Sequence, residues 1–101
     1  MREAAVFQLG VRAGTLREDD DGTFSFGYEA GYAGPPVSLT MPVRSEPYIY
    51  TRFPPFFEGL LPEGYQLEAL LKKAKLDRHD DFGQLVQVGA ELVGSVTIEA
   101  R

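Results

Sequence analysis

The chain has 101 residues, of which 44% are hydrophobic and 25% are charged, and its formal net charge is −5 at pH 7. This size fits one globular domain over residues 1–101, and without cysteine the chain forms neither disulfides nor thiolate metal sites. The acidic balance argues against direct binding to nucleic acid, and no apolar run has the roughly 20 residues that a membrane span needs.

Alternating apolar residues predict β-strands in the first half of the chain. Apolar side chains at the odd positions of segment 7–13 predict one half-buried strand, and those at the even positions of segment 24–30 predict another. The acidic stretch that ends in Gly22, at 19–22, is typical of a tight turn, so a hairpin is expected around it. A third strand is predicted over 37–43, with a weaker extended stretch over 48–53.

The second half of the chain changes to a helical period. After Pro62, apolar residues follow the i, i+3, i+4, i+7 spacing of an amphipathic helix. This apolar stripe consists of Leu67, Leu70, Leu71 and Ala74. A second short helix is expected from about Asp80 to Gly89, and a final strand over 92–98. The prediction is an α+β domain in which two helices pack on one side of a small, mainly antiparallel sheet.

No residue pattern indicates catalysis, a metal site or a cofactor. His79 is the only histidine and has no set of metal ligands around it, and the acidic run 18–21 lacks the spacing of a calcium loop. The kinase-like tripeptide 81–83 stands at an expected helix start, and the chain contains no asparagine to bind a second magnesium ion. We therefore expect a binding protein rather than an enzyme, and the absence of a secretory signal in segment 1–10 places it in the cytoplasm.

Tyr65 is the residue most suggestive of a partner. At about 100° per residue it points away from the apolar stripe of its helix, on the same face as Ala69 and Lys72. A large aromatic side chain on the solvent side of a helix can anchor a protein partner. The alternative is that Tyr65 folds back onto Phe56 or Phe57, which belong to an apolar block expected in the core together with Leu60 and Leu61.

Three blocks of the sequence resemble the N-terminal subdomain of HipA-type toxin kinases. The most specific is Phe56-Phe57-Glu58-Gly59-Leu60-Leu61-Pro62-Glu63-Gly64. It is preceded by the segment 37–42, which ends in Met-Pro, and followed by the segment 80–98, which contains Val-Gly and a glycine-bearing strand. The blocks stand in the order that the family shows and cover almost the whole chain.

The resemblance implies a function in a toxin–antitoxin system. A full HipA kinase continues for hundreds of residues beyond this subdomain, whereas this chain is expected to be a separate polypeptide similar to the HipS proteins of tripartite HipBST loci. Such a protein would be an antitoxin that binds a HipT-like serine/threonine kinase at or near its active site. The residues expected to contact the kinase are Tyr65, Glu63, Gly64, Gln66, Ala69 and Lys72.

Two other interpretations stay open. The chain could be a non-inhibitory assembly module that links the kinase to a HipB-like DNA-binding protein, in a complex where it does not itself touch DNA. It could also be a remnant of a HipA protein that has no activity alone. Both the antitoxin and the assembly module need only an interface, so the sequence does not separate them.

Overall fold

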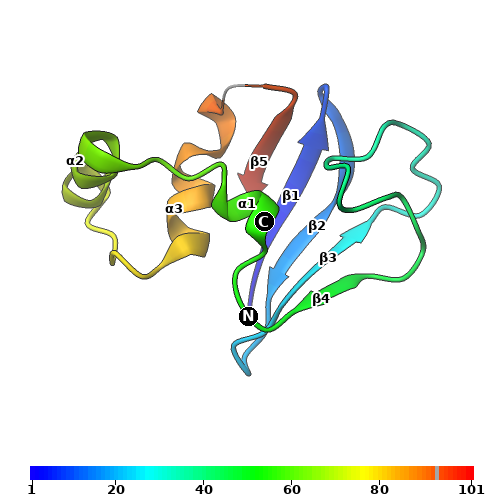
Figure 1. Cartoon of the computed structure of the whole chain (residues 1–101), viewed down its shortest axis with the longest axis horizontal. Coiled ribbons are helices and arrows are strands. Elements are labelled where there is room, and N and C mark those ends of the chain that lie inside the picture. Colours follow the sequence, from blue (N-terminus) through cyan, green and yellow to red (C-terminus); the bar gives the residue numbers. More distant parts are fainter. Residues whose placement is uncertain (93) are drawn as a thin grey trace.

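The computed structural model describes residues 1–92 and 94–101, and Figure 1 shows a sheet with helices gathered toward one end. The strands are β1 (Arg2–Gln8), β2 (Val11–Glu18), β3 (Phe24–Tyr28), β4 (Tyr48–Tyr50) and β5 (Val96–Ala100). The helices are α1 (Pro55–Glu58), α2 (Gly64–Ala74) and α3 (Asp81–Val88), and α3 continues into the 3-10 turn η1 (Gly89–Glu91). The sheet has the order β4-β3-β2-β1-β5, and all its neighbouring strands are antiparallel.

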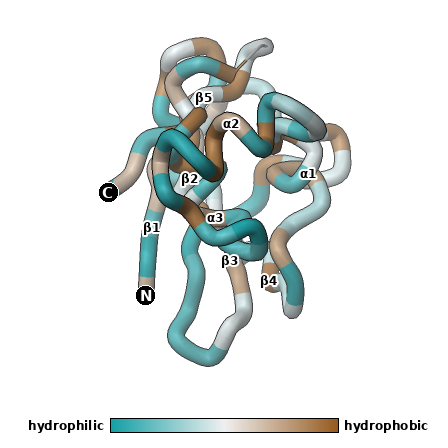
Figure 2. Tube along the Cα trace, turned by 90° about the vertical axis from the view of Figure 1, so that its left-hand side faces the viewer, coloured by the Kyte–Doolittle hydropathy of each residue, from teal (hydrophilic) through white to brown (hydrophobic). Residues whose placement is uncertain are grey.

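The single strand expected over 7–13 is wrong, because the chain turns back at Leu9 and Gly10 to form the β1–β2 hairpin. Leu9 has φ 52° and Gly10 has φ 81°, as both central residues of a tight two-residue turn require. The alternating pattern continues through this turn because Leu9 and Val11 are apolar although both are exposed. The expected hairpin around the acidic turn is present as β2 and β3, and the turn projects as a hydrophilic loop (Figure 2).

The third strand expected over 37–43 is also wrong, because this segment lies in the long loop between β3 and β4. Its only ladder contact among the described residues is an isolated bridge between Ser38 and Met41. Val37 and Met41 are buried while the residues between them turn outward, which produces an alternating pattern without a strand. The Tyr28 hydroxyl holds both ends of this turn, accepting a bond from the Val37 N–H and donating one to the Met41 carbonyl.

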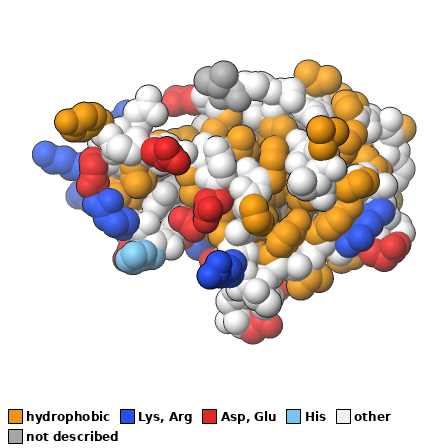
Figure 3. Space-filling model, viewed as in Figure 1, with side chains coloured by type: hydrophobic (Ala, Val, Ile, Leu, Met, Phe, Trp, Pro, Cys, Tyr) orange, Lys and Arg blue, Asp and Glu red, His pale blue; other side chains and the backbone are white. Residues whose placement is uncertain are grey.

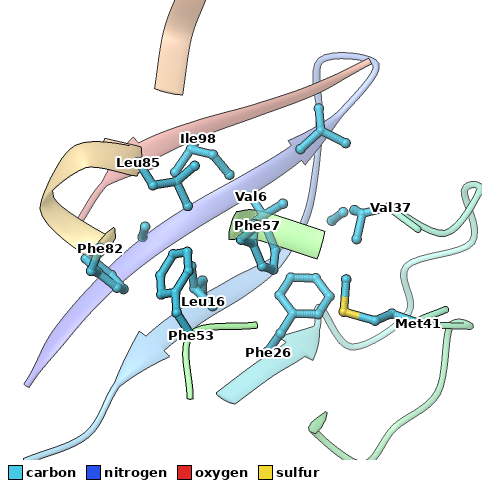
Figure 4. Close-up of a cluster of buried hydrophobic side chains, with 13 residues drawn as sticks. Val6, Leu16, Phe26, Val37, Met41, Phe53, Phe57, Phe82, Leu85 and Ile98 are labelled. Carbon is cyan, nitrogen blue, oxygen red and sulfur yellow. The ribbon is translucent and has the colours of Figure 1, made fainter. Parts of the chain in front are cut away.

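One hydrophobic core lies between a single face of the sheet and the helices α1 and α3. Figure 4 shows Phe57 of α1 and Phe82 and Leu85 of α3 converging on strand residues such as Leu16 and Phe26. Phe26 contacts Phe57 with ring centroids 5.6 Å apart. The predicted α+β class with an antiparallel sheet is confirmed.

α2 lies beyond α3, at the end of the molecule away from the sheet (Figure 1). None of its residues is buried, and its apolar stripe is half-buried where the helix contacts α3. An ion pair between Glu68 of α2 and Arg78, with an oxygen–nitrogen distance of 2.6 Å, links the helix to the segment that precedes α3. α2 therefore packs against the outside of the domain and contributes no residue to its core.

The outer edge of β5 is covered by the end of α3. Leu9 N–H donates to the Ser95 carbonyl and Arg101 N–H to the Glu3 carbonyl, so the odd-numbered residues of β5 face β1. The carbonyl of Ile98 therefore points to the free side of the strand, where Gly89 lies against it. Any larger residue at position 89 would place its Cβ onto that carbonyl oxygen, so glycine is required for this close approach.

Candidate partner-binding surface

The six residues expected to contact a partner lie on α2 and the residue before it, and all are exposed. Tyr65 is 95% exposed, the highest value among the large hydrophobic residues of the described chain. We define the α2 surface as Glu63, Gly64, Tyr65, Gln66, Ala69 and Lys72. Whether a partner binds there is a proposal, but the surface is free in this fold.

The start of α2 explains why Tyr65 projects so far. Pro62 and the extended residue Glu63 lead into the helix, and Gly64 takes φ 58°, which turns the chain sharply. Tyr65 stands in the first turn, where it has no preceding helical turn to lie on. The alternative that Tyr65 folds back onto Phe56 or Phe57 is wrong, since Tyr65 is almost fully exposed and those two rings contact each other.

A groove of about 680 Å³ separates α2 from the end of α3 and η1. Gln66 and Ala69 of the α2 surface form one of its walls. Its apolar lining comes from Leu60, Leu61, Pro62, Leu70, Val88 and Leu92. The α2 surface is therefore not a flat helix face but the rim of an apolar hollow.

Sequence reasoning missed this groove because it assigned the whole Phe56–Leu61 block to the core. Phe57 is fully buried, whereas Phe56, Leu60 and Leu61 are half-buried and pack against the core from outside. The Gly59 and Pro62 that flank the leucine pair are the one sequence signal of a surface turn there.

The end of the molecule formed by α2 carries basic and acidic side chains together. The helix and its first following residue contain three lysines, at positions 72, 73 and 75, and one glutamate, Glu63 precedes the helix, and Figure 3 shows both charge types at this end. Lysines near a helix C-terminus are favoured by the helix dipole. The hydrogen bond from Arg78 lowers the pKa of Glu68, so that glutamate stays ionised and occupied by its own partner.

The chemistry of this surface suits a protein partner. Within residues 1–92 and 94–101, no group of three or more His, Cys, Asp or Glu side chains could hold a metal ion. No helix in the same part of the chain is both long and apolar enough to cross a bilayer. What the surface offers is an exposed aromatic ring, a neighbouring apolar groove, an ammonium group at Lys72 and a carboxylate at Glu63, which together can bury apolar area and pair with charged groups of a partner.

Comparison with known proteins points to one family. Residues 4–99 match the family described as the HipA N-terminal domain. A solved structure of the N-terminal domain of HipA toxin superposes with a TM-score of 0.79 at 31% identity, over 100% of this chain and 93% of that one.

Two related sequences differ greatly in length. An uncharacterized protein of Haemophilus influenzae (strain Rd) is 34% identical over 99 residues, which span 98% of this chain and 92% of that protein. The protein named "Putative kinase Y4mE" of Sinorhizobium fredii is 28% identical over 97% of this chain but only 24% of its own length. With the fold, the three sequence blocks and the match over residues 4–99 in agreement, the chain belongs to the HipA N-terminal domain family.

Proposed function

We propose that this chain is an antitoxin that binds a HipT-like serine/threonine kinase in the cytoplasm and blocks it by direct contact at or near the active site. The observation that carries the proposal is the exposure of Tyr65. Its aromatic ring projects into solvent from the first turn of α2, and α2 has no buried residue. The chain acts as a binding protein, without chemistry of its own.

The relatives support a kinase as the partner. The matched region makes up 24% of the length of the Sinorhizobium relative, whose name describes it as a kinase, so in that protein the domain shares a chain with other material. In a kinase that lacks this domain, a separate copy could bind non-covalently at the position that the fused domain occupies in the longer relative. Its affinity must then come entirely from the interface, because no linker raises the effective concentration.

The shape and charge of the α2 surface support inhibition. A tyrosine buried at an interface commonly contributes about 2 kcal/mol or more on truncation, which corresponds to roughly a 30-fold change in affinity. Kinase active sites carry acidic side chains that bind magnesium ions and position the substrate hydroxyl, so a site without bound magnesium attracts a cation. Lys72, on the same helix face as Tyr65, matches that charge, and the ring would occupy space that the substrate or nucleotide needs.

The first experiment compares the purified kinase with and without an equimolar amount of this protein, recording autophosphorylation and substrate phosphorylation. We expect phosphorylation to stop with the wild-type chain, to return with Tyr65→Ala, and to stay suppressed with Tyr65→Phe, which keeps the ring. Ile49→Ala is the matched control, since Ile49 is a 65% exposed apolar residue on β4, in the sheet.

The outcomes separate the competing functions. Full inhibition by Tyr65→Ala would remove this residue from the mechanism. A stable complex in which the wild-type kinase stays fully active would favour the assembly module that links the kinase to a HipB-like protein. No binding at micromolar concentration, weaker than about −8 kcal/mol, would contradict the proposed function altogether.

A further inference from the structure

A second exposed apolar region lies away from α2, where the β1–β2 turn meets the loop between β3 and β4. Among the described residues, four of the seven exposed large hydrophobic side chains belong to two neighbouring turns. Leu9 lies in the β1–β2 turn and Val11 directly follows it, and Leu39 and Val43 stand in the loop between β3 and β4. We define these four residues as the loop-end patch; in Figure 1 the β3–β4 loop extends on the side of the sheet away from α2.

The two turns are joined into one surface. A groove of about 460 Å³ between them is lined by Leu9, Val11, Tyr32 and Pro35, and Tyr32 also borders the hollow that Val43 lines. Gln8 ties the two segments together, donating from Nε2 to the Pro36 carbonyl at 2.8 Å. The charges at this groove, Arg12 and Glu29, form an ion pair at 2.9 Å, so the groove is close to neutral. Arg44 lines the neighbouring hollow, where its guanidinium lies over the Tyr48 ring.

A leucine at position 9 is unfavourable for the stability of the fold, which suggests that this side chain has a function. Its φ of 52° lies in the left-handed region, which bulky side chains rarely adopt and where Asn-Gly is the preferred turn sequence. It is also 69% exposed, so its side chain gains little from burial in the domain. A strained, exposed leucine is best explained by a contact outside this chain.

Leu39 lies in a turn that hydrogen bonds and two buried neighbours fix in place. The flanking residues Val37 and Met41 are buried, and Tyr28 bonds to the backbone of both. Within the turn, the Thr40 N–H donates to the Ser38 Oγ at 3.2 Å and the Met41 N–H donates to the Ser38 carbonyl at 3.1 Å. Leu39 itself is 94% exposed, so an ordered backbone displays a fully solvated apolar side chain.

We infer that the loop-end patch is a second contact surface for the same kinase, which it holds while the α2 surface blocks the active site; this inference rests on the proposed function. A stable complex needs contact area beyond the α2 surface, because specific interfaces bury about 800 Å² on each partner, contributed by 20–30 residues. The α2 surface comprises six residues, and the loop-end patch offers further exposed apolar area. The occupant is an uncharged, apolar part of the kinase surface with a pocket that receives Leu39.

The principal test is Leu39→Asp, with Ile49→Asp as the matched control at an equally apolar but separate site. Binding of each variant to the kinase is measured by calorimetry, and inhibition is measured at saturating concentration. We expect Leu39→Asp to weaken binding at least tenfold while full inhibition returns at saturation. Tyr65→Ala gives the reverse pattern, a complex that forms but leaves the kinase active.

A second variant, Leu9→Asn, keeps the test independent of misfolding. Asparagine tolerates the left-handed conformation, so this change should raise the melting temperature by a few degrees. The same change should weaken kinase binding, because it removes an apolar contact. A variant that is more stable and yet binds less tightly cannot owe its weaker binding to a loss of structure.

Three results would overturn the inference. Wild-type affinity of Leu39→Asp and Leu9→Asn, with wild-type inhibition intact, would remove the patch from the interface and leave the proposed function standing. Self-association of the wild-type chain that Leu39→Asp abolishes, seen by sedimentation, would assign the patch to a second copy instead. No binding of the wild-type chain to the kinase would overturn the inference and the proposed function together.

Discussion

At the scale of single residues, one hydroxyl group organises the longest loop of the domain. Tyr28 stands at the end of β3, where its ring packs edge-on against Phe26 with centroids 4.9 Å apart. Its hydroxyl accepts from the Val37 N–H at 3.0 Å and donates to the Met41 carbonyl. Burial raises the pKa of Tyr28, so the group remains a neutral donor throughout the physiological range.

We expect Tyr28→Phe to lower the free energy of unfolding by about 1–2 kcal/mol, because it leaves a buried N–H and a carbonyl without their partner. Urea denaturation measures this loss, and faster hydrogen exchange at the Val37 amide would locate it in the loop. Tyr32→Phe is the control, since that hydroxyl bonds the Pro35 carbonyl at an exposed site and its removal should cost less than about 0.5 kcal/mol. Equal losses in the two variants would contradict the special role of Tyr28.

At the scale of elements, α3 is fixed to the sheet by a charged network at its first turn. Asp80 caps the helix by accepting from the Gly83 N–H at 3.1 Å, and it also accepts from Arg2 of β1 at 2.7 Å. Arg2 bonds Glu18 of β2 at 2.7 Å and lies over the Phe82 ring. The hydrogen bond from Arg2 is the main cause that lowers the pKa of Asp80 below its usual range.

The network predicts that part of the free energy of unfolding depends on pH. The variant Asp80→Asn isolates this part, because asparagine retains the helix cap but loses the ion pair with Arg2. A carboxyl group whose pKa is lowered on folding stabilises the fold above its unfolded pKa and loses that effect as pH falls through the folded pKa. At pH 7 the variant should be less stable by about 1 kcal/mol or less, since Arg2 is partly solvated. The difference should close as the pH falls below about 4. A constant difference across this range would contradict the assignment, and Asp80→Ala should lose about a further 1 kcal/mol with the cap.

The secondary structure could be predicted from the sequence wherever periodicity and burial coincide. The β2–β3 hairpin and α3 follow directly from alternation, a turn sequence and a capping aspartate. The predictions failed at Leu9 and over 37–43, where apolar residues alternate without forming a single strand. At these positions the pattern reflects an exposed leucine and a loop whose two ends are buried, and only the tertiary structure distinguishes them from a strand.

The candidate site was predictable to a smaller extent. A helical wheel suffices to place Tyr65 on the outer side of α2, because its position depends only on local helix geometry. The groove beside it and the loop-end patch each combine segments that are distant in the chain, such as Leu60 with Leu92 and Leu9 with Val43. No local pattern contains that information, since it arises from how the sheet and helices pack.

At the scale of the whole molecule, the two proposed contact surfaces are separate regions of a body measuring 40 × 30 × 23 Å. Changes at distant sites without shared partners usually add within about 0.5 kcal/mol. We therefore expect the loss of binding free energy in the double variant Tyr65→Ala/Leu39→Asp to equal the sum of the two single losses. Calorimetry with the kinase measures it, and a strongly non-additive result would indicate that both residues act through one local contact.

The close approach of Gly89 to Ile98 also has a consequence for how the chain behaves on its own. A free strand edge is a template on which another chain can add its own strand, and such pairing leads to aggregates. Here the end of α3 covers one edge of the sheet, and the other edge is the short strand β4. Strand addition by a second copy of this chain is thereby disfavoured at both edges of the sheet.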